Sequence, residues 1–123
     1  MPSPTPAELA ILEVLWARGP ATVREVHEAL EQRGTGYTTV LKLMQIMAGK
    51  GLLHRDERQR SHVYAPTIAQ ADVQGRLVDE LVERAFAGST SALVMRALGQ
   101  RPASDEELAQ IRALLDQIEG KPV

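Results

Sequence analysis

A row of polar side chains without negative charge lies between residues 37 and 45. Thr38, Lys42 and Gln45 recur at the spacing of one helix face, and Thr39 lies beside them. Threonine and glutamine can hydrogen-bond to base edges, and lysine can reach guanine or a phosphate. We therefore expect this face to contact DNA, with an ordinary solvated face as the alternative. Tyr37 is expected either to contact a phosphate or to pack under the segment that follows the helix.

A basic segment follows between two short apolar runs. It contains Arg55, Arg58 and Arg60, and the runs predict a hairpin with strands at about 53–57 and 61–65. Arginines at a hairpin tip are suited to phosphate contacts, although a charged tip can also be a plain solvated turn. Lys50 and Arg33, which flank the predicted helix, have the same two alternatives.

The charges are unevenly distributed along the chain. Residues 33–62 hold six basic and two acidic side chains, a net charge of +4, whereas residues 67–123 carry −3 and the whole chain −2. This distribution indicates one half that faces DNA and another half that faces a different partner.

Other chemistries have little support in the sequence. The chain has no cysteine, which removes disulfides, thiolate nucleophiles and cysteine-based metal sites. The histidines at 27, 54 and 62 fall on a helix and on two strand ends, so we expect no metal site. Gly34-Thr35-Gly36 is too short for a phosphate-binding loop, and no serine lies in a nucleophile elbow. We expect neither an enzyme nor a cofactor.

Three helical patterns and the hairpin form a predicted first domain, residues 6–66. Capping boxes at Thr5 and Thr22 start the first two helices, and a third helix is predicted from Tyr37 to Lys50. A polar exposed face on the third helix, followed by a basic hairpin, is typical of a winged helix-turn-helix. In that fold the third helix enters the major groove and the wing lies along the phosphates.

The remaining residues, 67–120, predict a second domain of three amphipathic helices. Their three apolar faces cannot all be buried within about 55 residues, so a second copy of the chain is the simplest partner. We therefore expect a mainly α-helical homodimer. The candidate dimerisation residues are Leu77, Leu81, Val82, Leu93, Leu98, Leu108, Ile111 and Leu115.

The sequence also predicts where the protein works. No apolar run approaches the roughly eighteen residues of a membrane span, and the first residues lack the pattern of a signal peptide. We expect a cytoplasmic protein without membrane insertion.

Several segments together resemble the penicillinase repressor family, the BlaI/MecI/CopY type. The resemblance covers roughly residues 6–119 and is specific only in combination. Its segments are 15–16 (LW), 19–26 (GPATVREV), 37–40 (YTTV), 50–53 (KGLL), 62–66 (HVYAP) and 81–89 (LVERAFAGS).

This resemblance implies a bacterial homodimer that binds a palindromic operator and represses genes for antibiotic resistance or metal homeostasis. It also implies base or phosphate contacts for Thr38, Thr39 and Lys42, and places Arg58 and Arg60 near the DNA backbone. A membrane sensor metalloprotease is an implied partner that cuts relatives at an Asn-Phe bond. The matching position here is Arg96-Ala97, so cleavage would need a different preference. The C-terminal cysteine pair of copper-responsive relatives is absent.

Two alternatives to a plain repressor stay open. The winged helix can serve protein–protein assembly with an incidental basic wing, or the protein can be a ligand-sensing DNA-binding regulator. The sequence itself points to no effector pocket, because aromatic residues are few and no polar cluster interrupts an apolar face.

Overall fold

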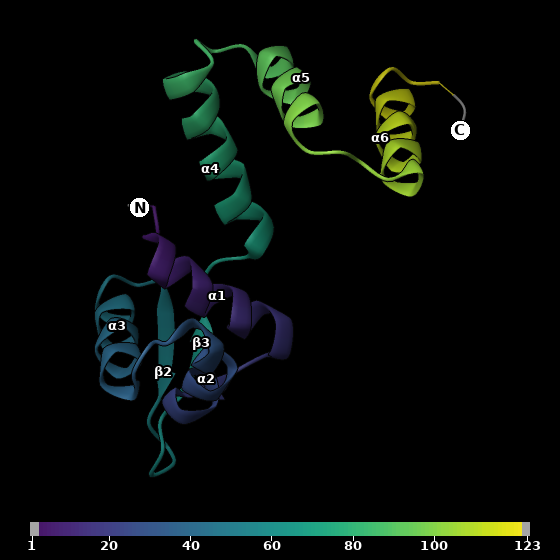
Figure 1. The fold of residues 1–123 in the computed structure, drawn as a ribbon. Helices are drawn as coiled ribbons and strands as arrows, with labels where there is room; N and C mark the ends of the chain where they lie inside the picture. Colours follow the sequence, from purple (N-terminus) through teal and green to yellow (C-terminus); the bar gives the residue numbers. More distant parts are fainter. Residues whose placement is uncertain (1–2, 122–123) are drawn as a thin grey trace. The chain divides into compact units, whose positions relative to one another are not determined.

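The computed structural model describes residues 3–121 of the chain. Six α-helices, one short 3-10 helix and three short strands follow one another in these residues, so the fold is mainly helical as predicted (Figure 1). In chain order the elements are α1 (Pro6–Arg18), β1 (Ala21–Thr22), α2 (Val23–Ala29), η1 (Glu31–Arg33), α3 (Tyr37–Gly49), β2 (Leu53–Asp56), β3 (Val63–Pro66), α4 (Gln70–Ala85), α5 (Thr90–Gln100) and α6 (Asp105–Ile118).

The predicted helix starts are confirmed. At the start of α1 the Thr5 hydroxyl accepts from the Glu8 backbone N–H at 3.2 Å, while the Glu8 carboxylate accepts from the Thr5 N–H at 2.9 Å. Thr22 and Ser104 begin α2 and α6 with the same reciprocal pair of hydrogen bonds. These boxes satisfy backbone donors that have no partner inside the helix, which is why local sequence alone locates them.

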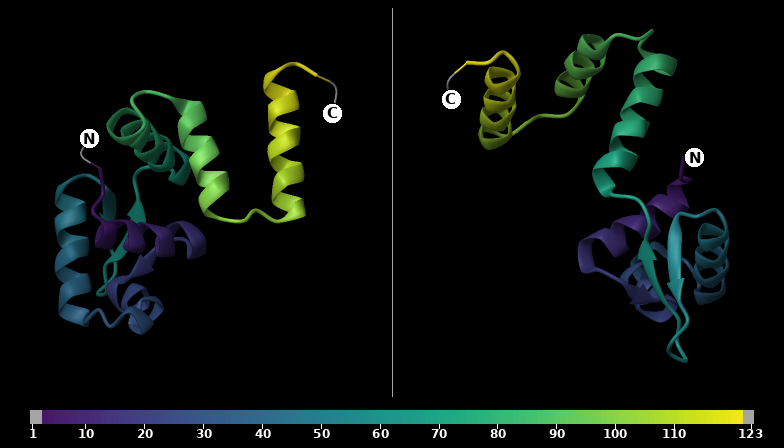
Figure 2. Two further views of the ribbon diagram at one scale, coloured as in Figure 1. Left: turned by 45° about the horizontal axis from the view of Figure 1, so that its top comes forward. Right: turned by 180° about the vertical axis from the view of Figure 1, so that it is seen from behind.

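The wing is a hairpin in a three-stranded antiparallel sheet of order β1-β3-β2. Strands β2 and β3 pair from Leu53 opposite Pro66 to Asp56 opposite Val63, which leaves residues 57–62 as the tip. This tip extends away from the helices around the sheet (Figure 2). The sequence did not predict β1, which adds two residues on the other side of β3.

The chain forms two compact units, one up to Val78 and the other from Asp79 on. The first unit holds a single core in which Ile11, Val40 and Met44 have no exposed surface. Trp16 lies at the edge of this core, and its indole N–H donates to the Ile68 carbonyl at 3.0 Å. Because the two units divide within α4, the predicted domain boundary after residue 66 stays a prediction.

A buried carboxylate holds the end of α3 to the start of α1. Only 1% of the Glu8 side chain is exposed, and the Lys50 ammonium donates to Glu8 Oε2 at 2.9 Å. Burial raises the pKa of Glu8, but hydrogen bonds from Thr5 and Lys50 outweigh it and leave this pKa below its usual value. The sequence analysis left two alternatives for Lys50, a phosphate contact or plain exposure to solvent. In the structure Lys50 pairs with Glu8.

We expect the Lys50→Met variant to unfold more readily than the wild type, by about 1–3 kcal/mol. The loss should stay below that of a fully buried pair, because 37% of the Lys50 side chain is exposed and water screens the interaction. Urea unfolding of Lys50→Met, Glu8→Gln and the double variant gives their coupling energy. Additive effects of the two substitutions on the free energy of unfolding would contradict a stabilising ion pair between Glu8 and Lys50.

The same pair predicts a dependence of stability on pH. Since the pKa of Glu8 is lower in the folded chain, its contribution is complete above the unfolded value of 4.5 and disappears as the pH falls through the folded value. The free energy of unfolding of the wild type should therefore fall as the pH drops below 4.5, and Glu8→Gln should flatten that part of the profile in urea unfolding measured over a series of pH values.

Candidate nucleic-acid interface

Helix α3 has one face in the core and one in solvent. Val40, Met44 and Met47 are fully buried, whereas the residues predicted to contact DNA are all exposed. This alternation follows from the helical spacing of the apolar residues and leaves a polar row on the surface of the winged helix. The exposed row consists of Thr38, Thr39, Lys42 and Gln45.

Tyr37 begins α3 and lies partly against α2. Its ring meets His27 edge to face, with the ring centroids 5.7 Å apart, yet 44% of the residue remains exposed. The contact orients the first turn of α3, where Gly36 provides no side-chain cap for the backbone N–H groups. This packing is against α2, whereas the sequence analysis expected packing under the segment that follows the helix. The phosphate contact of Tyr37 stays a prediction.

At the wing tip, Arg58 is tied to an acidic neighbour. Its guanidinium donates from Nε to Asp56 Oδ1 at 3.0 Å and from Nη2 to Asp56 Oδ2 at 2.7 Å, and its backbone N–H also donates to Oδ1. These hydrogen bonds lower the pKa of Asp56 to about 2, so the carboxylate is charged at any physiological pH. Because 88% of the Arg58 side chain is exposed, the pair is open to competition by a phosphate.

Arg55 is also paired within the wing. Its guanidinium lies 2.5 Å from a Glu57 carboxylate oxygen, and the side-chain hydrogen bond with Tyr64, followed by the charge of Glu57, raises the pKa of Arg55. Two of the three wing arginines thus have their charge balanced inside the hairpin. The net charge of the segment overstates the field that the wing presents to DNA.

Lys42 and Arg60 have no ion pair or hydrogen bond to any residue in the range 3–121. A DNA phosphate would therefore meet no internal competitor for these two charges. Arg60 lies beside an open groove of about 340 Å³ between α2, α3 and the wing. The groove is lined by Thr22, Val23, Arg24, Tyr37, Leu41, Gln45, Arg55, Arg60, Ser61, His62 and Tyr64.

The sequence analysis missed two residues of this surface. Arg24 lies in the first turn of α2, exposed and lining the groove. A cation at the start of a helix lies at the unfavourable end of the helix dipole. This position could have marked Arg24 as a candidate DNA contact in the sequence. Ile46 is 41% exposed although it is apolar, because it lies outside the buried stripe of α3. An exposed isoleucine beside the polar row is suited to a thymine methyl group.

A second candidate surface lies on the C-terminal helices. No residue of α5 or α6 is buried. Leu81, Leu98 and Leu115 are exposed to 47%, 39% and 51%. Val82 is only 8% exposed, because it is already buried within the chain, and it offers little area to a partner. The other predicted dimerisation residues, Leu77, Leu93, Leu108 and Ile111, are half-buried.

The predicted cleavage position lies inside α5. Arg96 and Ala97 are both exposed there and belong to regular helix. Elsewhere in residues 3–121 no helix is long and apolar enough to cross a membrane, and no three histidine, aspartate or glutamate side chains gather where they could hold a metal ion.

Comparisons with known proteins agree on one family. The family model described as penicillinase repressor matches residues 4–117. A transcriptional regulator named BlaI from Mycobacterium tuberculosis is 38% identical over 112 residues, which cover 89% of this chain and 80% of the relative. A penicillinase repressor from Bacillus licheniformis is 24% identical, with 95% of this chain and 92% of the relative covered.

Two further matches are more distant. The methicillin resistance regulatory protein MecI of Mammaliicoccus sciuri is 19% identical over 90% of this chain and 91% of its own length. Among solved structures, the transcriptional regulator Tm0710 from Thermotoga maritima matches with a TM-score of 0.51 and 22% identity, covering 94% of this chain and 74% of that one. This last likeness concerns the fold.

Proposed function

Because this chain belongs to the penicillinase repressor family, we propose that it represses transcription by occupying a two-fold symmetric operator as a homodimer. One observation carries the DNA-binding part: the exposed row of α3 lies on the same winged helix as Lys42 and Arg60, whose charges have no partner among residues 3–121. The names of the relatives support resistance genes as the targets, since two of them are a penicillinase repressor and a methicillin resistance regulatory protein.

The roles divide between the helix and the wing. Thr38, Thr39 and Gln45 offer donors and acceptors for base edges in the major groove, and Lys42 reaches guanine or a phosphate. Arg60 binds the DNA backbone directly, whereas Arg55 and Arg58 must exchange an acidic partner for a phosphate. Specificity therefore comes mainly from α3, and the salt-dependent part of the affinity comes from few cations.

The exposed apolar side chains of α5 and α6 support the proposed dimer. Large hydrophobic residues such as Met95 and Ile118 are exposed to 73% and 72%, which an isolated chain in water would not favour. A symmetric dimer covers the same surface on both copies and presents two winged helices to two half-sites. Release by a membrane sensor protease would require local opening of α5 around Arg96-Ala97.

Selection of bound sequences from a random double-stranded library by the full-length protein tests this function. We expect a two-fold symmetric motif whose half-sites are separated by whole helical turns, and an affinity that falls steeply with salt. Enrichment without symmetry would reject the dimeric operator. Absence of enrichment together with a flat salt dependence would instead favour a protein-assembly module.

The Asp56→Asn variant should bind operator DNA more tightly than the wild type, by about three- to tenfold at low salt. The amide still accepts from the Arg58 backbone N–H, so the tip keeps its turn, but the negative charge that competes with phosphate for Arg58 is removed. Fluorescence anisotropy across salt concentrations measures the change. Asp79→Asn on α4 removes the same charge outside the wing and should leave the affinity unchanged, whereas weaker binding of Asp56→Asn would contradict the assignment.

A further inference from the structure

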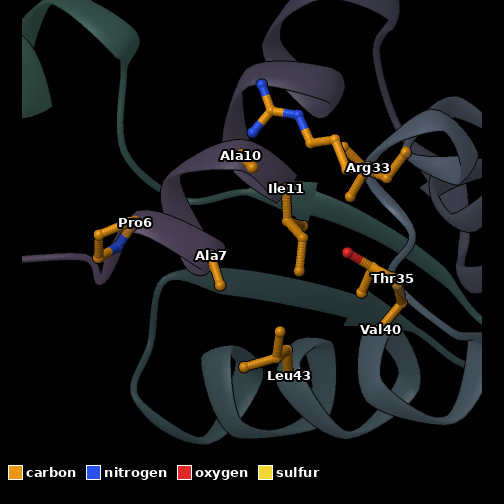
Figure 3. A pocket seen from close by; sticks show the side chains of 9 residues that line it. Pro6, Ala7, Ala10, Ile11, Arg33, Thr35, Val40 and Leu43 are labelled. Carbon is orange, nitrogen blue, oxygen red and sulfur yellow. The ribbon is translucent and has the colours of Figure 1, made fainter.

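A hollow of about 210 Å³ lies beside α3, on the flank away from the wing groove. It is bounded by the start of α1, the turn between α2 and α3, and the first turns of α3 (Figure 3). The sequence analysis predicted no such hollow, because its walls come from three separate segments of the chain. The lining residues are Pro6, Ala7, Ala10, Ile11, Leu30, Arg33, Thr35, Val40 and Leu43.

The lining combines apolar walls with one cation and one hydroxyl. Ile11 and Val40 have no exposed surface and lie behind the wall, whose accessible apolar part comes from Pro6, Ala7 and Leu43. In Figure 3 the Thr35 hydroxyl is directed toward Ile11, and the Arg33 guanidinium lies near Ala10. Arg33 is exposed and makes no ion pair or hydrogen bond with any residue that the structure describes. The hollow thus offers an unpaired guanidinium next to a surface that water solvates poorly.

We propose that this hollow binds a small organic carboxylate with an aromatic or branched aliphatic body. Sites for drug-sized ligands measure about 300–1,000 Å³, so this smaller volume is suited to a ligand of about ten non-hydrogen atoms. The planar fork of arginine matches a carboxylate with two hydrogen bonds, which favours this anion over a single point charge. The apolar body then displaces water from the walls formed by α1 and α3.

Because the hollow adjoins α3, a bound ligand can change the affinity for DNA. Val40 and Leu43 line the hollow, while Thr39 and Lys42 lie next to them on the exposed row of the same helix. A ligand that prefers one orientation of α3 over another shifts the affinity for DNA, and DNA shifts the affinity for the ligand by the same factor. The binding itself requires no DNA, so it can be tested independently of the proposed function.

The test uses the full-length protein with benzoate as the probe and benzamide as its neutral counterpart of similar shape. Calorimetry should show saturable binding at one site per chain, with a Kd for benzoate between about ten micromolar and a few millimolar. We expect benzamide to bind at least about tenfold more weakly, because it cannot pair with the guanidinium. Methyl NMR signals of Ile11, Val40 and Leu43 should shift on titration.

Two substitutions locate the site. Arg33→Gln should reduce the affinity for benzoate to that for benzamide. Ala7→Leu should abolish binding of both because the larger side chain fills the hollow, whereas Ala17→Leu is the same change on the same helix outside the lining and should have no effect. Thermal unfolding verifies that each variant is folded. If Ala7→Leu is not folded, the result for Arg33→Gln alone decides the test.

Three results would overturn the proposal. The first is non-saturable or absent binding of benzoate by the wild type. The second is equal affinity for benzoate and benzamide, which would mean that the arginine recognises no carboxylate. The third is benzoate binding that neither Arg33→Gln nor Ala7→Leu weakens, which would place the ligand elsewhere on the protein.

Discussion

The Leu115→Glu variant should be monomeric at micromolar concentration and should bind the operator at least about a hundredfold more weakly than the wild type. Leu115 is 51% exposed on α6, where no residue is buried within the chain, and in the proposed dimer the other copy covers it. A glutamate there would bury an unpaired charge in the dimer. The monomer keeps each winged helix but loses the gain in affinity from engaging two half-sites at once.

Sedimentation equilibrium and fluorescence anisotropy measure the two parts of this prediction. Gln110→Glu introduces the same charge on the same helix at an exposed polar position. It should leave the oligomeric state and the operator affinity unchanged. The melting transition of the winged helix should persist in Leu115→Glu, since its core lies in the other unit. A dimeric Leu115→Glu protein with normal affinity would show that α6 takes no part in the interface.

The Lys42→Ala and Arg60→Ala variants should each lower operator affinity, but with different signatures. Loss of one contact in each half-site costs about 1–3 kcal/mol per copy, or about 30-fold to 10⁴-fold for the dimer. Both cations lack an ion-pair partner among residues 3–121, so their removal leaves no acidic group in this range without its partner. The effect therefore reports on DNA and not on folding.

The dependence on sequence and salt separates a base contact from a phosphate contact. Arg60→Ala should weaken binding to operator and random DNA alike and reduce the salt slope by about one per copy. Lys42→Ala should also reduce the ratio of specific to non-specific affinity if it reads guanine. Arg112→Gln removes an exposed cation of α6 and serves as the control. Unchanged affinity in both Lys42→Ala and Arg60→Ala would reject α3 and the wing as the interface.

Much of the first unit could be predicted because its signals are local. The capping boxes at Thr5 and Thr22 act over three residues, and the apolar spacing of α3 determines which face is exposed. The two-residue strand β1 was missed because its pairing of Ala21 with Tyr64 joins distant parts of the chain. Such a pairing leaves no periodic pattern in the sequence.

The sequence by itself determined the order of the α-helices and of the hairpin, the polar row on α3 and the resemblance to a repressor family. Each depends on residue type and on spacing along the chain. Only the tertiary structure decided which cations are available to DNA. Lys50 pairs with buried Glu8, and Arg55 and Arg58 pair within the wing. Lys42 and Arg60 have no partner in the part of the chain that the structure describes. Charge can be counted from composition, but whether a charge is already neutralised depends on distances that folding sets.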